Sequence, residues 1–181
     1  MADQSVIDLL KRQHDEVRKQ FATVQKASGH QREQAFEELR YLLAVHETAE
    51  EEILHPFARR EFGDGARVVE ARLKEEHEAK ELLQQLEKTS VDDAEFQTLL
   101  DRLQRAVEEH AGKEETVEFP RVAEAATREQ LKGMAAAVQA AEKIAPTHPH
   151  PGAESPSRNY LAGPLASVVD RTRDAIRGAL H

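Results

Sequence analysis

A histidine and a glutamate interrupt the apolar face of one expected helix. Between residues 39 and 57 the apolar side chains recur at steps of three and four, and His46 and Glu50 fall on the same line. Four residues advance about 400° around a helix, so both side chains point inward. An unpaired buried polar group costs roughly 2–7 kcal/mol, and a lone buried carboxylate costs more. The core must therefore contain something that satisfies these two groups.

The same His-x-x-x-Glu pattern occurs a second time. Moving 64 positions along the chain takes His46 to His110 and Glu50 to Glu114. The second pair also continues an apolar stripe with helical spacing. A recurring motif on a buried face is much less typical of chance surface pairs than a single copy is.

Two further histidines show a similar relation. His14 and His77 are 63 positions apart, and each follows apolar residues at steps of four. Each half of the chain therefore provides one helix with a single inward histidine, followed by one helix with His-x-x-x-Glu. This internal duplication predicts two equivalent donor groups and a site for two metal ions.

The hydrophobic pattern predicts an all-α fold, an up-down-up-down four-helix bundle with additional C-terminal helices. Short connections between the helices favour antiparallel neighbours. Pro56 lies inside the second helix and should bend it just past the site. The four helices are expected at about residues 5–28, 32–62, 66–88 and 94–119.

The remainder of the chain is expected to form separate segments. The last segment is an amphipathic helix, which we expect to pack on the bundle or on a second copy in a homodimer; a membrane-surface helix is the weaker alternative. The expected divisions are a bundle at 1–125, an additional helix at 126–145, a proline-rich linker at 146–160 and the C-terminal amphipathic helix at 161–181.

Composition excludes several functional classes. The 181 residues include no cysteine, which excludes disulfides, iron–sulfur clusters and a cysteine nucleophile. A net charge of −9 without a basic run predicts no nucleic-acid partner. The chain has neither a secretory signal pattern nor an apolar run near the roughly 18 residues that cross a membrane. We therefore expect a soluble cytoplasmic protein without a membrane partner.

The donor types favour a pair of iron ions. Several imidazoles with two carboxylates are typical of di-iron sites, and Glu50 and Glu114 could bridge two ions about 3.5–4 Å apart. Ligating histidines must be neutral, so metal affinity should fall as the pH drops through about 6.5. The alternative is a core of histidines paired with glutamates without a cation. That arrangement would be costly and would leave the duplication unexplained.

Two weaker candidates lie near the first motif. Glu47 is about 100° from His46 and could reach the edge of the site as an extra ligand, although a solvated position is the simpler expectation. His55 is nine residues from His46 and thus on the opposite face of a straight helix, so only the bend at Pro56 could bring it in.

The sequence resembles the hemerythrin-like family of HHE cation-binding domains over about residues 5–120. The resemblance rests on the order of the motifs: a His-Asp-Glu triplet, His-x-x-x-Glu, His-Glu, and His-x-x-x-Glu. It implies an oxo- or hydroxo-bridged centre of two non-haem iron ions, with two bridging carboxylates and four terminal histidines. Carried over by position, the ligands are His14, His46, Glu50, His77, His110 and Glu114.

One position departs from the oxygen-carrying members of the family. They have a further histidine four residues before the third-helix ligand, where this chain has Leu73. A missing ligand leaves an additional open position, which favours a small molecule that binds and reacts. No catalytic residues beyond the metal ligands are predicted.

Two functions follow as hypotheses. The first is catalase-like breakdown of hydrogen peroxide. The second is a module that binds or senses oxygen, nitric oxide or iron without turnover. A ferritin-like bundle ranks last, because it needs two inward Glu-x-x-His motifs and only Glu52 to His55 has that spacing.

Overall fold

The computed structural model describes residues 5–144 and 162–180, in which all regular structure is helical. The prediction of an all-α fold is confirmed. The expected linker at 146–160 lies outside the described residues. The helices are α1 (Val6–Lys26), α2 (Gly29–Ala49), α3 (His55–Glu61), α4 (Gly65–Leu86), α5 (Ala94–Lys113), α6 (Phe119–Ala125), α7 (Arg128–Ile144) and α8 (Ala162–Leu180), with two π-helical segments, η1 (Glu50–Leu54) and η2 (Glu114–Glu118).

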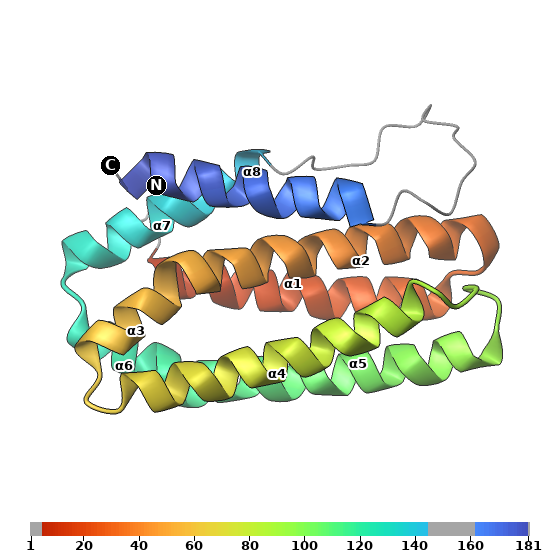
Figure 1. The fold of residues 1–181 in the computed structure, drawn as a ribbon, viewed down its shortest axis with the longest axis horizontal. Coiled ribbons are helices and arrows are strands. Elements are labelled where there is room, and N and C mark those ends of the chain that lie inside the picture. The colour runs from red at the N-terminus through yellow and green to blue at the C-terminus, as the bar shows by residue number, and fades with distance from the viewer. Residues whose placement is uncertain (1–4, 145–161, 181) are drawn as a thin grey trace.

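The bundle is built from four long rods. α2 continues through η1 into α3, and α5 continues through η2 into α6, while α1 and α4 complete the set (Figure 1). α1 packs against α2 and α5, and α4 packs against α5 and α3. The additional helices α7 and α8 pair with each other, and they cover α1 and α2 respectively. The predicted bundle with C-terminal helices is therefore the observed fold.

The first helix begins as its sequence indicates. The Ser5 hydroxyl accepts a hydrogen bond from the Asp8 N–H at 3.2 Å, and the Asp8 carboxylate accepts one from the Ser5 N–H at 3.1 Å. This reciprocal capping box satisfies two backbone donors that a helix start leaves free.

The turn between α3 and α4 depends on a missing side chain. A Cβ atom at Gly65 would lie 2.1 Å from the carbonyl oxygen of Ala58 and 2.8 Å from the Cα of Arg59. Glycine therefore allows α4 to begin directly against the backbone of α3.

Each π-helical segment ends immediately before a His-Pro or Phe-Pro pair. Proline has no N–H to donate, and its ring crowds the carbonyl four residues earlier. The wider π turn accommodates this: the N–H of His55 bonds to the carbonyl of Glu50, and the N–H of Phe119 bonds to that of Glu114. The sequence indicated a bend near Pro56, and the structure places the distortion just before it, at the carboxylate itself. π segments of this kind are frequent at functional sites.

Two apolar clusters fill the bundle and leave a polar layer between them. One contains Leu10, Ile53 and Phe57 at the end where the chain enters α1, and the other contains Phe21, Phe36 and Leu103 towards the far end. The residues of the repeated motifs lie between the two clusters. A polar layer with apolar walls on both sides has little access to water, which strengthens the electrostatic interactions inside it.

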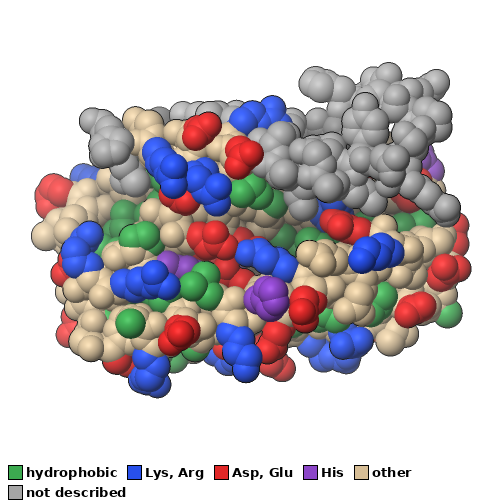
Figure 2. All heavy atoms as spheres, in the orientation of Figure 1, with side chains coloured by type: hydrophobic (Ala, Val, Ile, Leu, Met, Phe, Trp, Pro, Cys, Tyr) green, Lys and Arg blue, Asp and Glu red, His purple; other side chains and the backbone are tan. Residues whose placement is uncertain are grey.

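The surface is charged and mixed. On the face in Figure 2, acidic and basic side chains are interspersed over α2 and α4. Within the described ranges, no helix combines the length and apolar character needed to span a membrane.

Candidate metal centre

The two His-x-x-x-Glu motifs meet at the centre of the bundle. Glu50 has Oε1 3.3 Å from the Nε2 of His46 and Oε2 3.7 Å from the Nε2 of His110. Glu114 has Oε2 3.3 Å from the Nε2 of His14 and Oε1 3.2 Å from the Nε2 of His110. Each carboxylate thus presents one oxygen to the α1–α2 side and the other to the α5 side, which is the arrangement that two bridged cations require.

The outer nitrogen of each imidazole is held by an oxygen acceptor. An Nδ1–H that donates to such an acceptor leaves Nε2 as an unprotonated donor atom that faces the centre. The three Nδ1 contacts are His14 with the carboxylate of Glu115 at 2.8 Å, His46 with the side-chain carbonyl of Gln13 at 2.8 Å, and His110 with the carboxylate of Glu75 at 3.1 Å.

His14 and His46 face each other through these inner nitrogens. Their Nε2 atoms are 3.0 Å apart. Two nitrogen lone pairs at this distance repel unless a proton or a metal ion lies between them. Burial, and next the charge of His14, lower the pKa of His46 to about 3, so at neutral pH the ring of His46 carries no second proton on Nε2. A cation fits this position.

The donor atoms form two overlapping groups within the described residues. Each group has its donor atoms within 4.8 Å of one another. The two groups are His14, His46, Glu50 and Glu114, and Glu50, Glu76 and His110. Because Glu50 belongs to both groups, the geometry offers two adjacent positions for cations rather than one.

The candidate donor from α4 is Glu76, and the prediction that His77 faces the core is wrong. The side chain of His77 is 74% exposed and its Nε2 lies 3.5 Å from a carboxylate oxygen of Glu81 on the same helix. His77 is eight residues after the buried Val69, or about 80° off its line, whereas Glu76 is seven residues after it and about 20° off. Each step of four residues advances about 400° around the helix, so residues at repeated steps of four move progressively away from a narrow buried face.

In α1, a histidine at the same spacing is nevertheless buried. His14 also lies eight residues after a buried valine, Val6, but α7 covers α1 on a further side, so Gln13 and His14 are both buried. α4 packs mainly against α3 and α5, and its buried stripe is narrower.

The carboxylates at the centre have strongly perturbed pKa values. Burial, and then the neighbouring Glu114, raise the pKa of Glu50 well above its usual value. Burial also disfavours the charged form of Glu114, but contacts with His110 and His14 outweigh it and hold the pKa of Glu114 well below its usual value. Burial lowers the pKa of His110, but Glu114 and Glu50 raise it to about 12. Without a metal, a protonated His110 thus supplies the positive charge that the carboxylates need.

Several buried polar atoms in the described residues have no hydrogen bond. Such orphan atoms are rare in folded proteins, because each costs about 1–3 kcal/mol or more. Their concentration around one point indicates a bound species. They include both carboxylate oxygens of Glu50, Glu76, Glu114 and Glu118, both ring nitrogens of His55, and the Nε2 of His110.

Glu47, the weaker candidate ligand, lies at the edge of the site. Its carboxylate is 3.2 Å from the ammonium group of Lys80, which also contacts Glu51 and Glu76. Burial raises the pKa of Glu47, and Lys80 partly offsets this effect. The structure does not bring Glu47 into either donor group.

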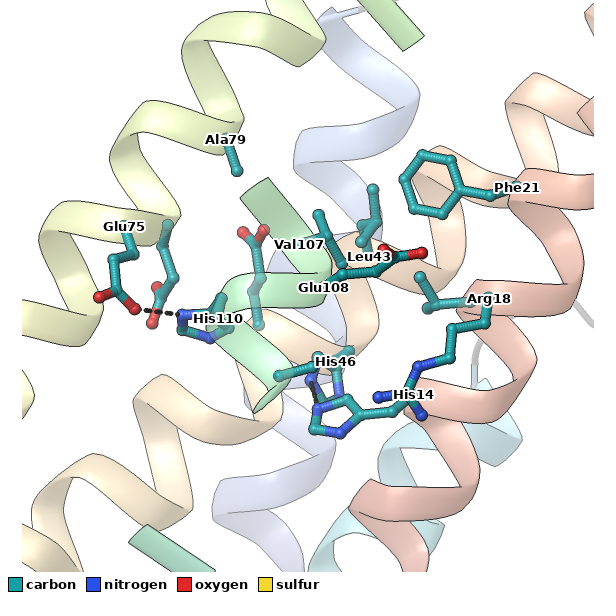
Figure 3. A pocket seen from close by; sticks show the side chains of 14 residues that line it. His14, Arg18, Phe21, Leu43, His46, Glu75, Ala79, Val107, Glu108 and His110 are labelled. Carbon is teal, nitrogen blue, oxygen red and sulfur yellow. Dashed lines mark hydrogen bonds and ion pairs between the residues drawn. The ribbon is translucent and has the colours of Figure 1, made fainter. Parts of the chain in front are cut away.

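A small cavity adjoins the donor atoms. Its volume is about 30 Å³, and its polar wall includes His14, His46 and His110 while Phe21, Leu43 and Val107 belong to its apolar wall (Figure 3). A water molecule needs about 10–15 Å³ by this measure, so the cavity suits a ligand of two heavy atoms.

Sequence reasoning missed Glu76 and the acceptors that hold the imidazoles, such as Gln13, and it named His55 only as a weaker candidate. Glu76 has a detectable signal, since Val69, Glu76 and Leu83 lie seven apart, a spacing that follows a helix face more closely than repeated steps of four. The signal for His55 is Pro56, which indicated a distortion of the helix, although spacing alone does not give the π segment that turns His55 inward.

The fold and the site together define a class of protein. It is a four-helix bundle that buries histidines and carboxylates between two apolar clusters, as a candidate metal centre. Residues 5–122 match the family model of the hemerythrin HHE cation-binding domain. The chain therefore belongs to the hemerythrin HHE cation-binding family.

Known proteins resemble the chain to different extents. It is 28% identical over 134 residues to an uncharacterized hemerythrin-like protein of Schizosaccharomyces pombe. The matched region covers 73% of this chain and 66% of that protein. It is 28% identical over 141 residues to a DNA nickase of Nostoc sp.. That matched region covers 77% of this chain and 40% of the nickase. The chain thus spans about two thirds or less of the length of these relatives.

The fold also has a counterpart among solved structures. The crystal structure of a hemerythrin HHE cation-binding domain-containing protein from Mycobacterium kansasii superposes with a TM-score of 0.71. The superposition covers 98% of this chain and 99% of that one, at 17% identity. At this identity the likeness concerns the fold.

Proposed function

We propose that this protein binds two non-haem iron ions at the polar layer of the bundle and breaks down hydrogen peroxide there. The observation that carries the proposal is the position of Glu50 and Glu114, each with one oxygen towards either donor group. The proposed ligands are His14, His46, Glu50, Glu76, His110 and Glu114.

Iron suits this donor set better than other common metals do. Imidazole and carboxylate donors without thiolate favour iron, manganese or zinc, and mixed sites with two carboxylates between two ions are typical of iron. The imidazoles are oriented by Glu115, Gln13 and Glu75, the kind of outer hydrogen bond that fixes the tautomer and raises ligand basicity. Bound iron would supply the change of oxidation state that peroxide dismutation needs.

The residues around the cavity supply what peroxide requires from the protein. The cavity of about 30 Å³ admits a molecule with two oxygen atoms and few waters besides. Its apolar wall, with Phe21, Leu43 and Val107, keeps bulk water away from the donor atoms. Glu47 lines the same cavity, and because burial raises its pKa, its carboxylate can hold a proton that peroxide releases and return it to the product water.

The second candidate function is the binding or sensing of oxygen, nitric oxide or iron without turnover. The apolar wall of the cavity favours it, because a diatomic gas needs no proton donor. A second favourable feature is the contact of α8 with η1: Arg173 and Arg177 both bind the carboxylate of Glu52, two residues after Glu50. This contact would connect occupancy of the site with the C-terminal helix.

A nucleic-acid substrate is not part of the proposal. The name DNA nickase belongs to a relative of which this chain covers 40%. The net charge of −9 disfavours binding to a phosphate backbone.

Oxygen release from peroxide tests the primary proposal. Iron-reconstituted protein with two bound ions should evolve oxygen at an electrode after hydrogen peroxide is added, over many turnovers. His110→Ala should lower the rate at least about tenfold, while the matched change His77→Ala at an exposed position should leave it unchanged. No evolution from protein that holds two irons would reject peroxide breakdown. Spectral changes on adding oxygen or nitric oxide to the reduced protein would then support the second candidate.

A further inference from the structure

His55 is a buried imidazole without a hydrogen-bonding partner. It is 3% exposed, and neither ring nitrogen has a hydrogen bond within the described residues. Its Nε2 lies 3.5 Å from Oε1 of Glu76, whose two oxygens also lack hydrogen bonds. Two such groups side by side in a dry interior are unfavourable unless a further species binds both.

The backbone explains how His55 reaches the site. On a straight helix it would lie opposite His46. The π segment Glu50–Leu54 adds one residue to a turn, which rotates the following residues by about 100°. The rotation moves His55 from the outer face of the rod into the bundle, next to α4.

The other half of the duplication shows that packing alone does not require a histidine here. The equivalent position, 64 residues on, is Phe119, which is 1% exposed and stacks on the ring of His14 with centroids 5.7 Å apart. The chain thus uses an apolar ring at this place in one half, and an imidazole with two free nitrogens in the other. The imidazole adds a donor atom that the apolar ring lacks.

We propose that His55 is a further ligand of the metal ion held by Glu76 and His110. The inference rests on the two-metal site of the proposed function. His55 would supply from α3 the donor that is missing at Leu73. The side chain of Leu73 packs against an apolar cluster instead. A transition-metal cation such as divalent iron or cobalt is the ligand class, because imidazole with carboxylate is its usual donor set.

The number of donors makes the two positions unequal. With Glu50 and Glu114 shared, the position at Glu76 has five protein ligands and the position at His14 and His46 has four. His55 does not line the cavity, whereas His14 and His46 do. Glu76 and His110 line the cavity too, so the cavity reaches both positions. The exchangeable position for a small molecule is on the His14–His46 side because the ion there has one protein ligand fewer.

Titration with cobalt(II) tests the ligand role without relying on activity. Metal-free wild-type protein is titrated in a calorimeter, with the cobalt absorption bands followed in parallel. His55→Phe introduces the residue that the other half has, and His77→Phe makes the same change at an exposed histidine as the control. We expect two equivalents in wild type and in His77→Phe. In His55→Phe, we expect the first equivalent to be retained and the second to bind at least about tenfold more weakly.

A second variant guards against a folding defect. In His55→Ala, 10 mM imidazole should restore the second equivalent, which a merely misfolded protein would not show. Two equivalents of unchanged affinity in His55→Phe, or no restoration by imidazole in His55→Ala, would overturn the ligand role and leave the two-metal site intact. Fewer than two equivalents in wild type would instead overturn the proposed function, and this inference with it.

Discussion

Glu50 and Glu114 begin the two π-helical segments at equivalent positions of the duplication, and both carboxylates are completely buried. Each carboxylate therefore lies on the wide π turn of its rod. That turn ends immediately before the residue that precedes proline. Burial, and then the charge of Glu114 nearby, raise the pKa of Glu50. A cation between the donor groups would relieve this repulsion, and several predictions depend on it.

Glu50→Gln should reduce the stabilisation that metal confers by more than half. At a free metal concentration of 100 times Kd, wild type should gain about 2.7 kcal/mol, or about 5–10 °C in Tm. The variant should gain less than half of this, because it lacks the shared oxygen. Its metal-free form should stay within about 1 kcal/mol of wild type, since burial and the neighbouring Glu114 disfavour the charged form of Glu50 and glutamine resembles the neutral form. Thermal unfolding followed by circular dichroism measures both effects, and a full metal-induced rise in the variant would contradict the bridging role.

Glu76→Gln and His77→Ala should differ sharply in metal content. Glu76→Gln should reduce the bound iron from two ions to about one, because it removes the α4 donor from the second group. His77→Ala should keep both ions and change stability by no more than about 0.5 kcal/mol, as exposed substitutions do. Elemental analysis of reconstituted protein distinguishes them. Equal iron in both variants would show that α4 provides no ligand.

The stability that Glu118 contributes to the metal-free protein should fall as the pH rises from about 5 to 7. Burial, and next the charge of Glu114, raise the pKa of Glu118 from its usual 4.5 to about 7, so the folded state binds this proton more tightly than the unfolded state does. The stabilising contribution is complete below pH 4.5 and is lost as the pH passes 7. Glu76, with a pKa raised to about 8, acts in the same direction.

Glu118→Gln isolates this effect. Between pH 5 and 8, the free energy of unfolding of wild type should fall by about 2 kcal/mol more than that of the variant. Urea unfolding at a series of pH values, in the presence of a chelator, gives the comparison. An identical pH profile in wild type and variant would show that Glu118 titrates normally. The lowered pKa values of His46 and His55 oppose the trend only below about 6.5, where an unfolded histidine becomes protonated.

Metal binding should slow amide hydrogen exchange in α8. Arg173 Nε is 2.6 Å from Oε1 of Glu52, and Arg177 Nε is 3.2 Å from Oε2. When a metal fixes Glu50, the same π segment should hold Glu52 and the two guanidinium groups more firmly. Hydrogen exchange with mass spectrometry compares metal-free and loaded protein, and Glu52→Gln should weaken the response at a stability cost of about 1 kcal/mol or less. Equal exchange in both states would remove any relay through α8.

Gly65→Ala should destabilise the bundle by about 1–3 kcal/mol or more. Its Cβ would lie 2.1 Å from the carbonyl oxygen of Ala58, so backbone must move. Gly133→Ala in α7 is the matched control, since nothing lies within 4 Å of its Cβ position. It should stabilise by about 0.5–1 kcal/mol, as glycine is a weak helix former. Denaturant unfolding measures both, and equal midpoints would contradict the close approach of α3 and α4.

The sequence by itself determined the helices, their antiparallel order and the two His-x-x-x-Glu motifs. These follow from local chemistry: side chains four apart share a face, and a buried polar pair needs a partner. His14 was identified in the same way, and the structure brings it to the motifs.

Only the tertiary structure decided which residue of α4 faces the centre and whether His55 does. The choice between Glu76 and His77 depends on how wide a face the neighbouring helices cover, since the two side chains differ by only about 100°. The position of His55 depends on a π turn that inserts one residue into the helical count. Neither the packing partners of a helix nor its local unwinding is encoded in spacing alone, because both arise from how distant parts of the chain pack together.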